Sequence, residues 1–284
     1  MRWTPGGQSQ DVEDRRGQGG IPIGGMGGGR LGLGGLLLLL LLSAVFHRDL
    51  VSMFYGGEAP APVSQSYANR SAGNDREVQF VSFILDDAQR TWDQLLPESA
   101  GTPYRHAKLV LFDNYTPSGC GLAQSATGPF YCPADEKVYI DLGFFQDLRD
   151  RYGAPGEFAQ AYVLAHEIGH HVQKVLGIEG KVRRLQQANP GARNPLSVAL
   201  ELQADCLAGV WGHSTAQRDL IDAADIEAGI RAAGAVGDDR LQKAATGTVS
   251  PENFTHGSSA QRAAWFRRGL EQGAVSSCDT LATK

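Results

Sequence analysis

Apolar residues recur at helical spacing over two stretches in the second half of the chain. The first lies between Pro155, where a helix can begin, and Gly177, where one can end. The second starts at Asn194, a good N-cap that is followed by a proline, and its apolar face extends to Trp211. The pattern therefore predicts an amphipathic helix in each of these stretches.

Shorter patterns predict the other elements of the same globular domain. A helix is expected over 77–96, and strands are expected over 108–112 and 137–142. Residues 214–245 are rich in alanine and helical in pattern. The predicted fold class is α+β, mainly helical with a small β-sheet.

The N-terminal quarter of the chain has a different composition. Residues 1–30 are rich in glycine and polar residues, which predicts a flexible tail. The apolar run at 31–46 contains seven consecutive leucines, and we predict a transmembrane anchor over 31–50. This run is slightly shorter than the usual minimum of about 17 residues for a spanning helix. Residues 51–76 read as a linker to a domain over 77–284.

The charges around the apolar run predict how it is oriented. Arg15, Arg16 and Arg30 precede the run, whereas Arg48 after it is nearly cancelled by Asp49. This bias favours a cytoplasmic N-terminus, with the rest of the chain outside the cytoplasm, in the periplasm or at the cell surface. A cleaved signal peptide is the alternative. The region before the run is long, however, and no good cleavage site follows it.

Composition and charge exclude some classes of function. The 284 residues carry a formal net charge of −5, and the sequence pI is about 5.8, so nothing indicates nucleic-acid binding. The glycines at 24–29 are a weak candidate for a phosphate-binding loop. No strand precedes them, and the G-x-x-x-x-G-K-[ST] pattern is missing from the sequence.

The first amphipathic helix carries a metal-binding pattern. His166 and His170 lie four residues apart, which places both imidazoles on one face of a helix, where they can share one Zn²⁺. Glu167 can reach a water bound to that metal and accept its proton. The alternative is an ordinary amphipathic helix with exposed polar residues. His171 points away from the other two histidines and is not expected to be a ligand.

The second amphipathic helix supplies a third ligand. Catalytic zinc sites usually have three protein ligands and one open position. Glu201 is charged but lies among apolar residues, where a carboxylate needs a partner such as a metal. Asp205 lies four residues later on the same face, and we expect it to accept the free ring N–H of a ligand histidine. The alternative is a solvated acidic pair on a surface helix.

At these residues the chain resembles the bacterial neutral zinc metallopeptidase family. The resemblance rests on HEIGHH at 166–171 and on ELQADC at 201–206. The segments VEDRRG at 12–17 and HGSSAQR at 256–262 are similar to that family too. The resemblance covers nearly the whole chain, and it implies a zincin-like fold and a membrane-anchored protein.

Four cysteines allow two disulfides, the default outside the cytoplasm. We pair Cys120 with Cys132, because they bracket a loop rich in Gly, Ser and Pro, which leaves Cys206 to pair with Cys278. Zinc binding by cysteine is a poorer explanation, since no C-x₂₋₄-C spacing exists.

Peptide hydrolysis creates an oxyanion, which a second donor beside the metal usually stabilises. His256, beside a glycine, is the first candidate for this catalytic role, and Tyr139, Arg240 and His213 are others. The strand at 137–142 precedes the motif helix, and in zincins such a strand often lines the cleft and pairs with extended substrate.

The sequence therefore predicts a membrane-anchored zinc metallopeptidase that hydrolyses peptide bonds in a peptide or protein substrate. One zinc ion per chain is bound by His166, His170 and Glu201, and Glu167 is the general base. A zinc-binding scaffold without turnover is one alternative, although such a structural site needs no base at Glu167. A zinc amidase acting on cell-wall peptide is another, and the sequence does not separate it from a peptidase.

Overall fold

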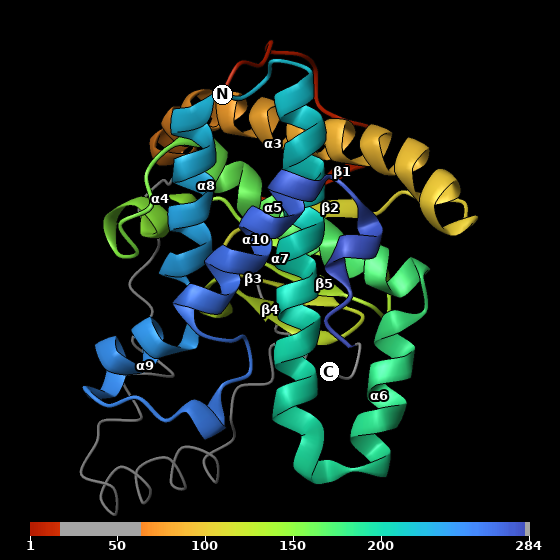
Figure 1. Ribbon diagram of the computed structural model, residues 1–284. Coiled ribbons are helices and arrows are strands. Elements are labelled where there is room, and N and C mark those ends of the chain that lie inside the picture. The colour runs from red at the N-terminus through yellow and green to blue at the C-terminus, as the bar shows by residue number, and fades with distance from the viewer. Residues whose placement is uncertain (18–63, 282–284) are drawn as a thin grey trace, which may run out of the picture. The chain divides into compact units, whose positions relative to one another are not determined.

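The computed structural model describes residues 1–17 and 64–281 (Figure 1). The helices in these residues are α3 (Ser64–Ala100), α4 (Gly143–Asp150), α5 (Glu157–Val175), α6 (Ile178–Ala188), α7 (Arg193–Gln217), α8 (Ala223–Ala235), α9 (Asp238–Thr246) and α10 (Ser259–Gln272). The strands are β1 (Val12–Asp14), β2 (Lys108–Phe112), β3 (Tyr115–Ser118), β4 (Gly121–Gln124), β5 (Phe130–Cys132) and β6 (Lys137–Asp141). The predicted class, mainly helical α+β with a small sheet, is confirmed.

Four strands form one sheet, in the order β1-β2-β6-β5, and β3 and β4 form a separate hairpin. β1, β2 and β6 are parallel, whereas β5 runs antiparallel to β6. The strand predicted at 137–142 exists as β6, but it lies inside the sheet with a buried centre. It was expected to line the cleft and pair with substrate. That expectation is wrong, because β5 covers its outer side and forms the edge of the sheet.

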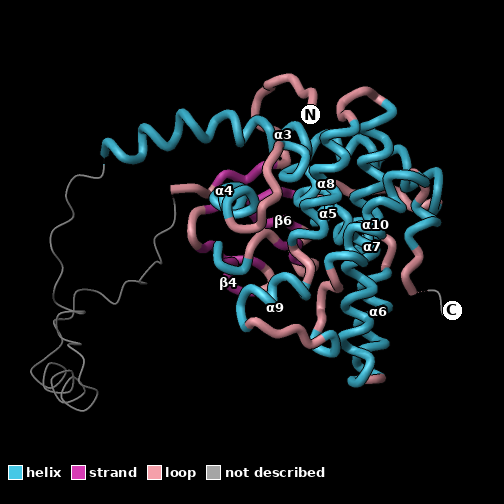
Figure 2. The backbone as a smooth tube through the Cα atoms, turned by 60° about the vertical axis from the view of Figure 1, so that its left-hand side comes forward, coloured by secondary structure: helices cyan, strands magenta, loops and turns pink. Residues whose placement is uncertain are grey.

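The helices α5, α7, α8 and α10 pack together beside the strands (Figure 2). Glycine permits the close contact of α7 with α10. A Cβ atom on Gly209 would lie 2.2 Å from the carbonyl oxygen of Phe266, and one on Gly269 would lie 1.9 Å from that of Cys206. Only residues without a side chain allow two helix backbones to come this close.

The expected boundaries of several elements change in the structure. The helix predicted at 77–96 is α3, which begins at Ser64, inside the predicted linker at 51–76. The stretch 214–245 was expected to be helical throughout, but it is divided into the end of α7, then α8 and then α9. A capping box of Asp222 and Asp225 begins α8, because each side chain accepts a backbone N–H of the other residue.

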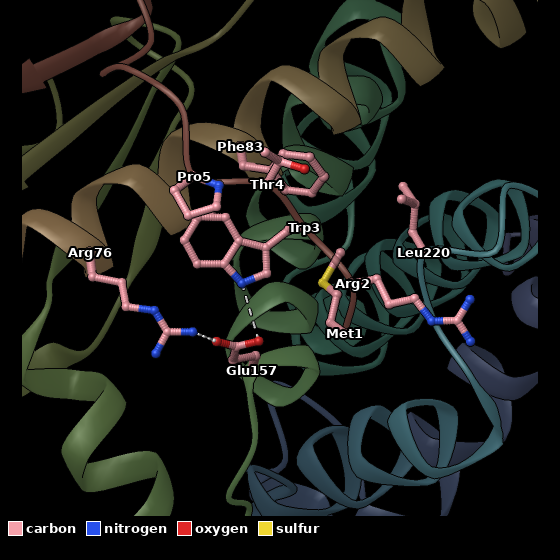
Figure 3. A pocket seen from close by; sticks show the side chains of 9 residues that line it. All are labelled: Met1, Arg2, Trp3, Thr4, Pro5, Arg76, Phe83, Glu157 and Leu220. Atoms are coloured by element: carbon pink, nitrogen blue, oxygen red, sulfur yellow. Dashed lines mark hydrogen bonds and ion pairs between the residues drawn. The ribbon is translucent and has the colours of Figure 1, made fainter.

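The segment 1–17 belongs to the globular domain. The indole N–H of Trp3 donates to Glu157 at the start of α5, and Arg76 of α3 binds the other oxygen of that carboxylate (Figure 3). Val12 is buried in the core, and the Lys137 ammonium lies 2.6 Å from Glu13. The expectation of a flexible tail is therefore wrong for residues 1–17.

Of the residues that the structure describes, no helix is both long enough and apolar enough to cross a membrane. The leucine run at 31–46, on which the predicted anchor rests, lies outside the described residues.

Both expected disulfides are present. Cys120, in the turn of the β3–β4 hairpin, is bonded to Cys132 at the end of β5. Cys206 of α7 is bonded to Cys278, in a single turn of 3₁₀ helix that follows α10. Disulfides of this kind persist in oxidising compartments, which supports an extracytoplasmic domain.

Candidate metal centre

Two helices bring the three predicted ligands together. His166 and His170 lie one turn apart on α5, and Glu201 comes from α7, which packs against α5. One oxygen of Glu201 lies 3.2 Å from Nε2 of His166, and the other lies 3.5 Å from Nε2 of His170. The candidate ligand atoms of all three residues lie within 4.8 Å of one another. Two imidazoles and a carboxylate are a donor set that suits zinc.

The other ring nitrogen of each histidine has its own partner. Nδ1 of His166 lies 2.8 Å from an oxygen of Asp205, as the spacing predicted. Nδ1 of His170 lies 2.9 Å from Oε1 of Gln173, which the sequence analysis missed. Both partners are acceptors, so each Nδ1 carries a proton, and Nε2, which faces Glu201, is the ring atom left to bind a metal. The i+3 spacing of Gln173 from His170 was the signal that could have found it.

Asp205 is fully buried and fully bonded. Besides His166, it accepts hydrogen bonds from the Tyr162 hydroxyl at 2.5 Å and from Nε and Nη2 of Arg262 at 2.9 and 3.0 Å. Burial acts to raise the pKa of the Asp205 carboxyl, but Arg262 and His166 outweigh it and lower that pKa. Arg262 comes from α10, and its guanidinium also lies 4.0 Å from Glu201.

The electrostatic field of the centre favours a cation. Burial acts to lower the pKa of His166, but Asp205 and then Glu201 raise it to about 10. Burial acts to raise the pKa of Glu201, yet His170 and His166 hold it well below its usual range. The carboxylates thus attract positive charge to the imidazoles, and a divalent metal satisfies the same field without a ring proton at Nε2.

The centre opens into a cleft of about 510 Å³. Glu167 follows His166 on α5 and lines this cleft together with all three candidate ligands. His256, the predicted oxyanion donor, lines it too, from the loop before α10. The structure therefore brings both predicted catalytic side chains to the cleft that contains the metal ligands.

Comparison with known proteins shows the family of this chain. The family described as "putative neutral zinc metallopeptidase" matches residues 1–281. The chain belongs to this family. It is 49% identical to YpfJ of Escherichia coli (strain K12) over 288 residues, which cover 99% of each protein. It is 44% identical to Rv2575 of Mycobacterium tuberculosis (strain H37Rv) over 202 residues, 67% of this chain and 66% of that protein. No solved structure matches the chain.

In this zinc metallopeptidase family member, an aspartate that the sequence analysis missed holds His256. One oxygen of Asp238 accepts the backbone N–H groups of Thr255, His256 and Gly257, at 2.7, 2.7 and 3.0 Å. The other oxygen lies 3.2 Å from Nδ1 of His256. The His256 side chain remains 50% exposed. Asp238 thus fixes both the loop and the ring, and it leaves Nε2 of His256 available to a ligand in the cleft.

The other candidate oxyanion donors do not line the cleft in the described part of the chain. Tyr139 lies in β6, where its hydroxyl donates to Asp135 and its ring stacks on Phe130. Nδ1 of His213 bonds to the carbonyl oxygen of Leu270, and Arg240 is exposed on α9. These three alternatives therefore find no support in the geometry.

His171 is fully buried and is not among the residues that line the cleft. Its Nε2 lies 2.6 Å from the carbonyl oxygen of Arg105, which can only accept, so Nε2 carries the proton. Its Nδ1 then accepts the Tyr131 hydroxyl at 2.9 Å. Tyr131 lies in the edge strand β5 and lines the cleft, so His171 ties that edge to α5.

Proposed function

We propose that this chain is a zinc-dependent metallopeptidase that hydrolyses peptide bonds in a peptide or protein substrate. The observation that carries the proposal is the convergence of His166, His170 and Glu201 beside Glu167 in one cleft. A zinc ion held by the three ligands would supply a Lewis acid that polarises the scissile carbonyl and lowers the pKa of water. The two Nδ1 partners support this assignment, because they leave both Nε2 atoms free to bind it.

Glu167 acts as the proton carrier. It is held on the same helix as both histidines, and it faces the cleft without belonging to the three-ligand set. A carboxylate in this position takes a proton from the attacking water and then delivers it to the leaving amine. A structural zinc site would need no such group, so Glu167 favours an enzyme over a scaffold.

His256 stabilises the oxyanion, and Asp238 orients it. When Nδ1 donates to Asp238, Nε2 of the neutral ring is an acceptor, so donation to an oxyanion requires the protonated ring. The zincin-like arrangement remains part of this proposal. It is supported by an edge strand, β5, that packs against α5 and can pair with extended substrate.

We also propose that the domain functions outside the cytoplasm and is attached to the membrane through the leucine run at 31–46. The two disulfides support the compartment. The attachment rests on the composition of the run.

The test of the proposed function is Glu167→Gln in the full chain. The variant keeps one zinc per chain and its fold, but it loses turnover by a factor on the order of 10² or more, because an amide cannot accept the proton. Metal analysis and hydrolysis of a peptide library, with cell-wall peptide as a second substrate, measure both properties. Activity within a few-fold of wild type would show that Glu167 is not the base.

A further inference from the structure

A continuous chain of hydrogen bonds connects the ligand His170 to the C-terminal disulfide. Nδ1 of His170 donates to Gln173, whose amide nitrogen donates to Oε1 of Gln203 at 3.1 Å. The amide nitrogen of Gln203 donates in turn to the carbonyl oxygen of Cys278 at 2.9 Å. Every link has the same direction, and Cys278 is covalently bonded to Cys206.

The orientation of each amide is determined by its neighbours. Gln173 also donates to the carbonyl oxygen of Leu200 at 2.7 Å, and a carbonyl oxygen can only accept. The amide nitrogen of Gln173 must therefore face Leu200 and Gln203, and its oxygen must face His170. The carbonyl of Cys278 imposes the same order on Gln203. If either amide were flipped, its oxygen would face another acceptor and its nitrogen would face another donor.

Both glutamines of this hydrogen-bond chain are buried. Gln173 is 1% exposed and Gln203 is 6% exposed, and both cysteines of the disulfide are buried. A buried amide that loses its partner is left with an unsatisfied polar group, which favours a shift towards another partner. A change at the Cys278 end is therefore transmitted to the His170 end.

The disulfide determines where the Cys278 carbonyl lies. Gln203 and Cys206 are three residues apart on α7, so the bond holds Cys278 over the face that carries Gln203. Two weaker contacts also hold this segment. Arg268 donates to the carbonyl oxygen of Ser277, and Thr280 donates to that of Ala199. Without the disulfide the segment would be held by hydrogen bonds, so we expect a graded loss of order.

The other ligand histidine and the other disulfide provide the contrast. His166 is held by Asp205, whose remaining partners are Tyr162 and Arg262. The Cys120–Cys132 disulfide joins the β3–β4 hairpin to β5. In the described residues, no hydrogen bond of the His170–Cys278 chain involves that disulfide.

We propose that the Cys206–Cys278 disulfide positions the zinc ligand His170 through Gln203 and Gln173, so that tight zinc binding requires this bond. The inference rests on the proposed function, since it takes His166, His170 and Glu201 as the zinc ligands. Gln173 and Gln203 are positioning residues, because they act on the metal through His170.

The consequence is an order of assembly. The bond forms by thiol–disulfide exchange: the Cys206 and Cys278 thiols give two electrons and two protons to an external protein disulfide, which is released as two thiols. Zinc then binds tightly to the oxidised chain. A reduced chain would bind zinc more weakly, so where zinc is limiting the site would fill only after the chain reaches an oxidising compartment.

Zinc affinity of the purified full chain tests this proposal, measured by competition with a chromophoric chelator below the unfolding temperature of every variant. The Cys206→Ser/Cys278→Ser variant is expected to bind zinc about 10-fold more weakly, the lower end of effects from groups that orient a ligand. Gln203→Met keeps both disulfides and is expected to show a similar loss. Combining the two changes should add little, since both interrupt one chain.

The matched control is Cys120→Ser/Cys132→Ser, which removes a disulfide but should keep zinc affinity within about 2-fold, less than the 10-fold minimum for groups that orient a ligand. Equal weakening in this control, unchanged affinity in Cys206→Ser/Cys278→Ser or in Gln203→Met, or additive losses on combination would each overturn the inference. A wild-type chain that binds no zinc would overturn the proposed function itself, and the two failures are therefore distinguishable.

Discussion

The carboxylate of Asp205, on α7, is surrounded by donors from two other helices: His166 and Tyr162 of α5 and Arg262 of α10. Of these contacts, the bond to His166 would act on a bound metal, because it fixes the ring tautomer and raises the basicity of Nε2. The bonds to Arg262 and Tyr162 hold the carboxylate in place. A single buried aspartate therefore joins a ligand, a tyrosine and a buried cation.

We predict that Asp205→Asn weakens zinc affinity by about 10–100-fold without abolishing it, the usual effect of a group that orients a ligand. The asparagine oxygen can still accept from His166, but its amide nitrogen then faces Arg262, which only donates. Glu201→Gln should weaken binding much more, because the ligand itself loses its charge. Competition titration with a chelator measures both variants.

Tyr162→Phe is the control for Asp205→Asn, since it removes a single donor from the same carboxylate. Its zinc affinity should fall less than that of Asp205→Asn. Equal loss of zinc in Asp205→Asn and Glu201→Gln, or an Asp205 oxygen found about 2 Å from the metal, the distance of a direct ligand, would refute the orienting role.

The i+4 spacing predicted the pairing of His166 with His170 and of Glu201 with Asp205, each on one helix face. Glu201 was predicted as the third ligand because it is a charge among apolar residues. The spacing could not show Arg262 as a partner of Asp205. The two residues are 57 positions apart, and their contact depends on how α10 packs against α7. Asp238 was missed for the same reason, since its contact with His256 depends on a loop conformation.

At the scale of elements, the contact between α7 and α10 is the most sensitive to substitution. A methyl group on Gly269 would lie 1.9 Å from the Cys206 carbonyl oxygen and 2.9 Å from the Gly209 Cα, so the two backbones would have to separate. We predict that Gly269→Ala lowers the free energy of unfolding by about 1–3 kcal/mol or more, as overpacked sites do. Denaturant unfolding of the purified chain measures the loss.

Gly234 of α8 provides the matched control, because a methyl group there would meet no atom closer than 3.6 Å. Gly234→Ala should be neutral or should stabilise the chain by up to about 1 kcal/mol, the difference between the two residues in a helix. If both substitutions lowered stability equally, the close contact at Gly269 would not be the cause.

The spacing of apolar residues predicted the long elements of the fold but not the shortest strands. The helices α5 and α7 were predicted because each extends over several turns of apolar spacing. The strands β1 and β5 have three residues each, too few to show a period of two, and each is held in place by a neighbouring strand. Pairing with substrate was therefore expected of the strand at 137–142, which has a visible pattern and precedes the motif helix.

At the scale of the whole molecule, the pairing of β1 with β2 constrains how the chain can be placed across a membrane. β1 pairs with β2, yet the leucine run at 31–46 lies between them in the sequence. If that run crossed a bilayer once, the two strands would lie on opposite sides and their hydrogen bonds could not form. The cytoplasmic N-terminus predicted from Arg15, Arg16 and Arg30 is therefore incompatible with an extracytoplasmic domain that contains β1.

Composition did not predict that residues 1–17 pack on the domain, because the glycines at 24–29 dominate the first 30 residues. The residues that bind the segment to the domain are dispersed: Trp3 packs near the rings of Phe80 and Phe83, and Val12 enters the core. The residues of the domain that they contact lie beyond residue 75. Single-sequence patterns describe neighbours along the chain, so they could not reveal a contact of this range.

The last prediction is that residues 1–17 lie in the same compartment as the catalytic domain. Docking buries Val12, worth about 1.5–3 kcal/mol for a fully buried side chain of this size, and it covers the outer edge of β2. Val12→Asp should undock the segment, whereas a substitution at the exposed Gln10 should not. An epitope tag before Met1 should therefore be digested together with the domain when protease is added to spheroplasts, and Val12→Asp should alter the rate of that digestion.

A tag protected from protease while the domain is digested would mean that the run at 31–46 crosses the membrane once, and that β1 leaves the sheet in the membrane-attached protein.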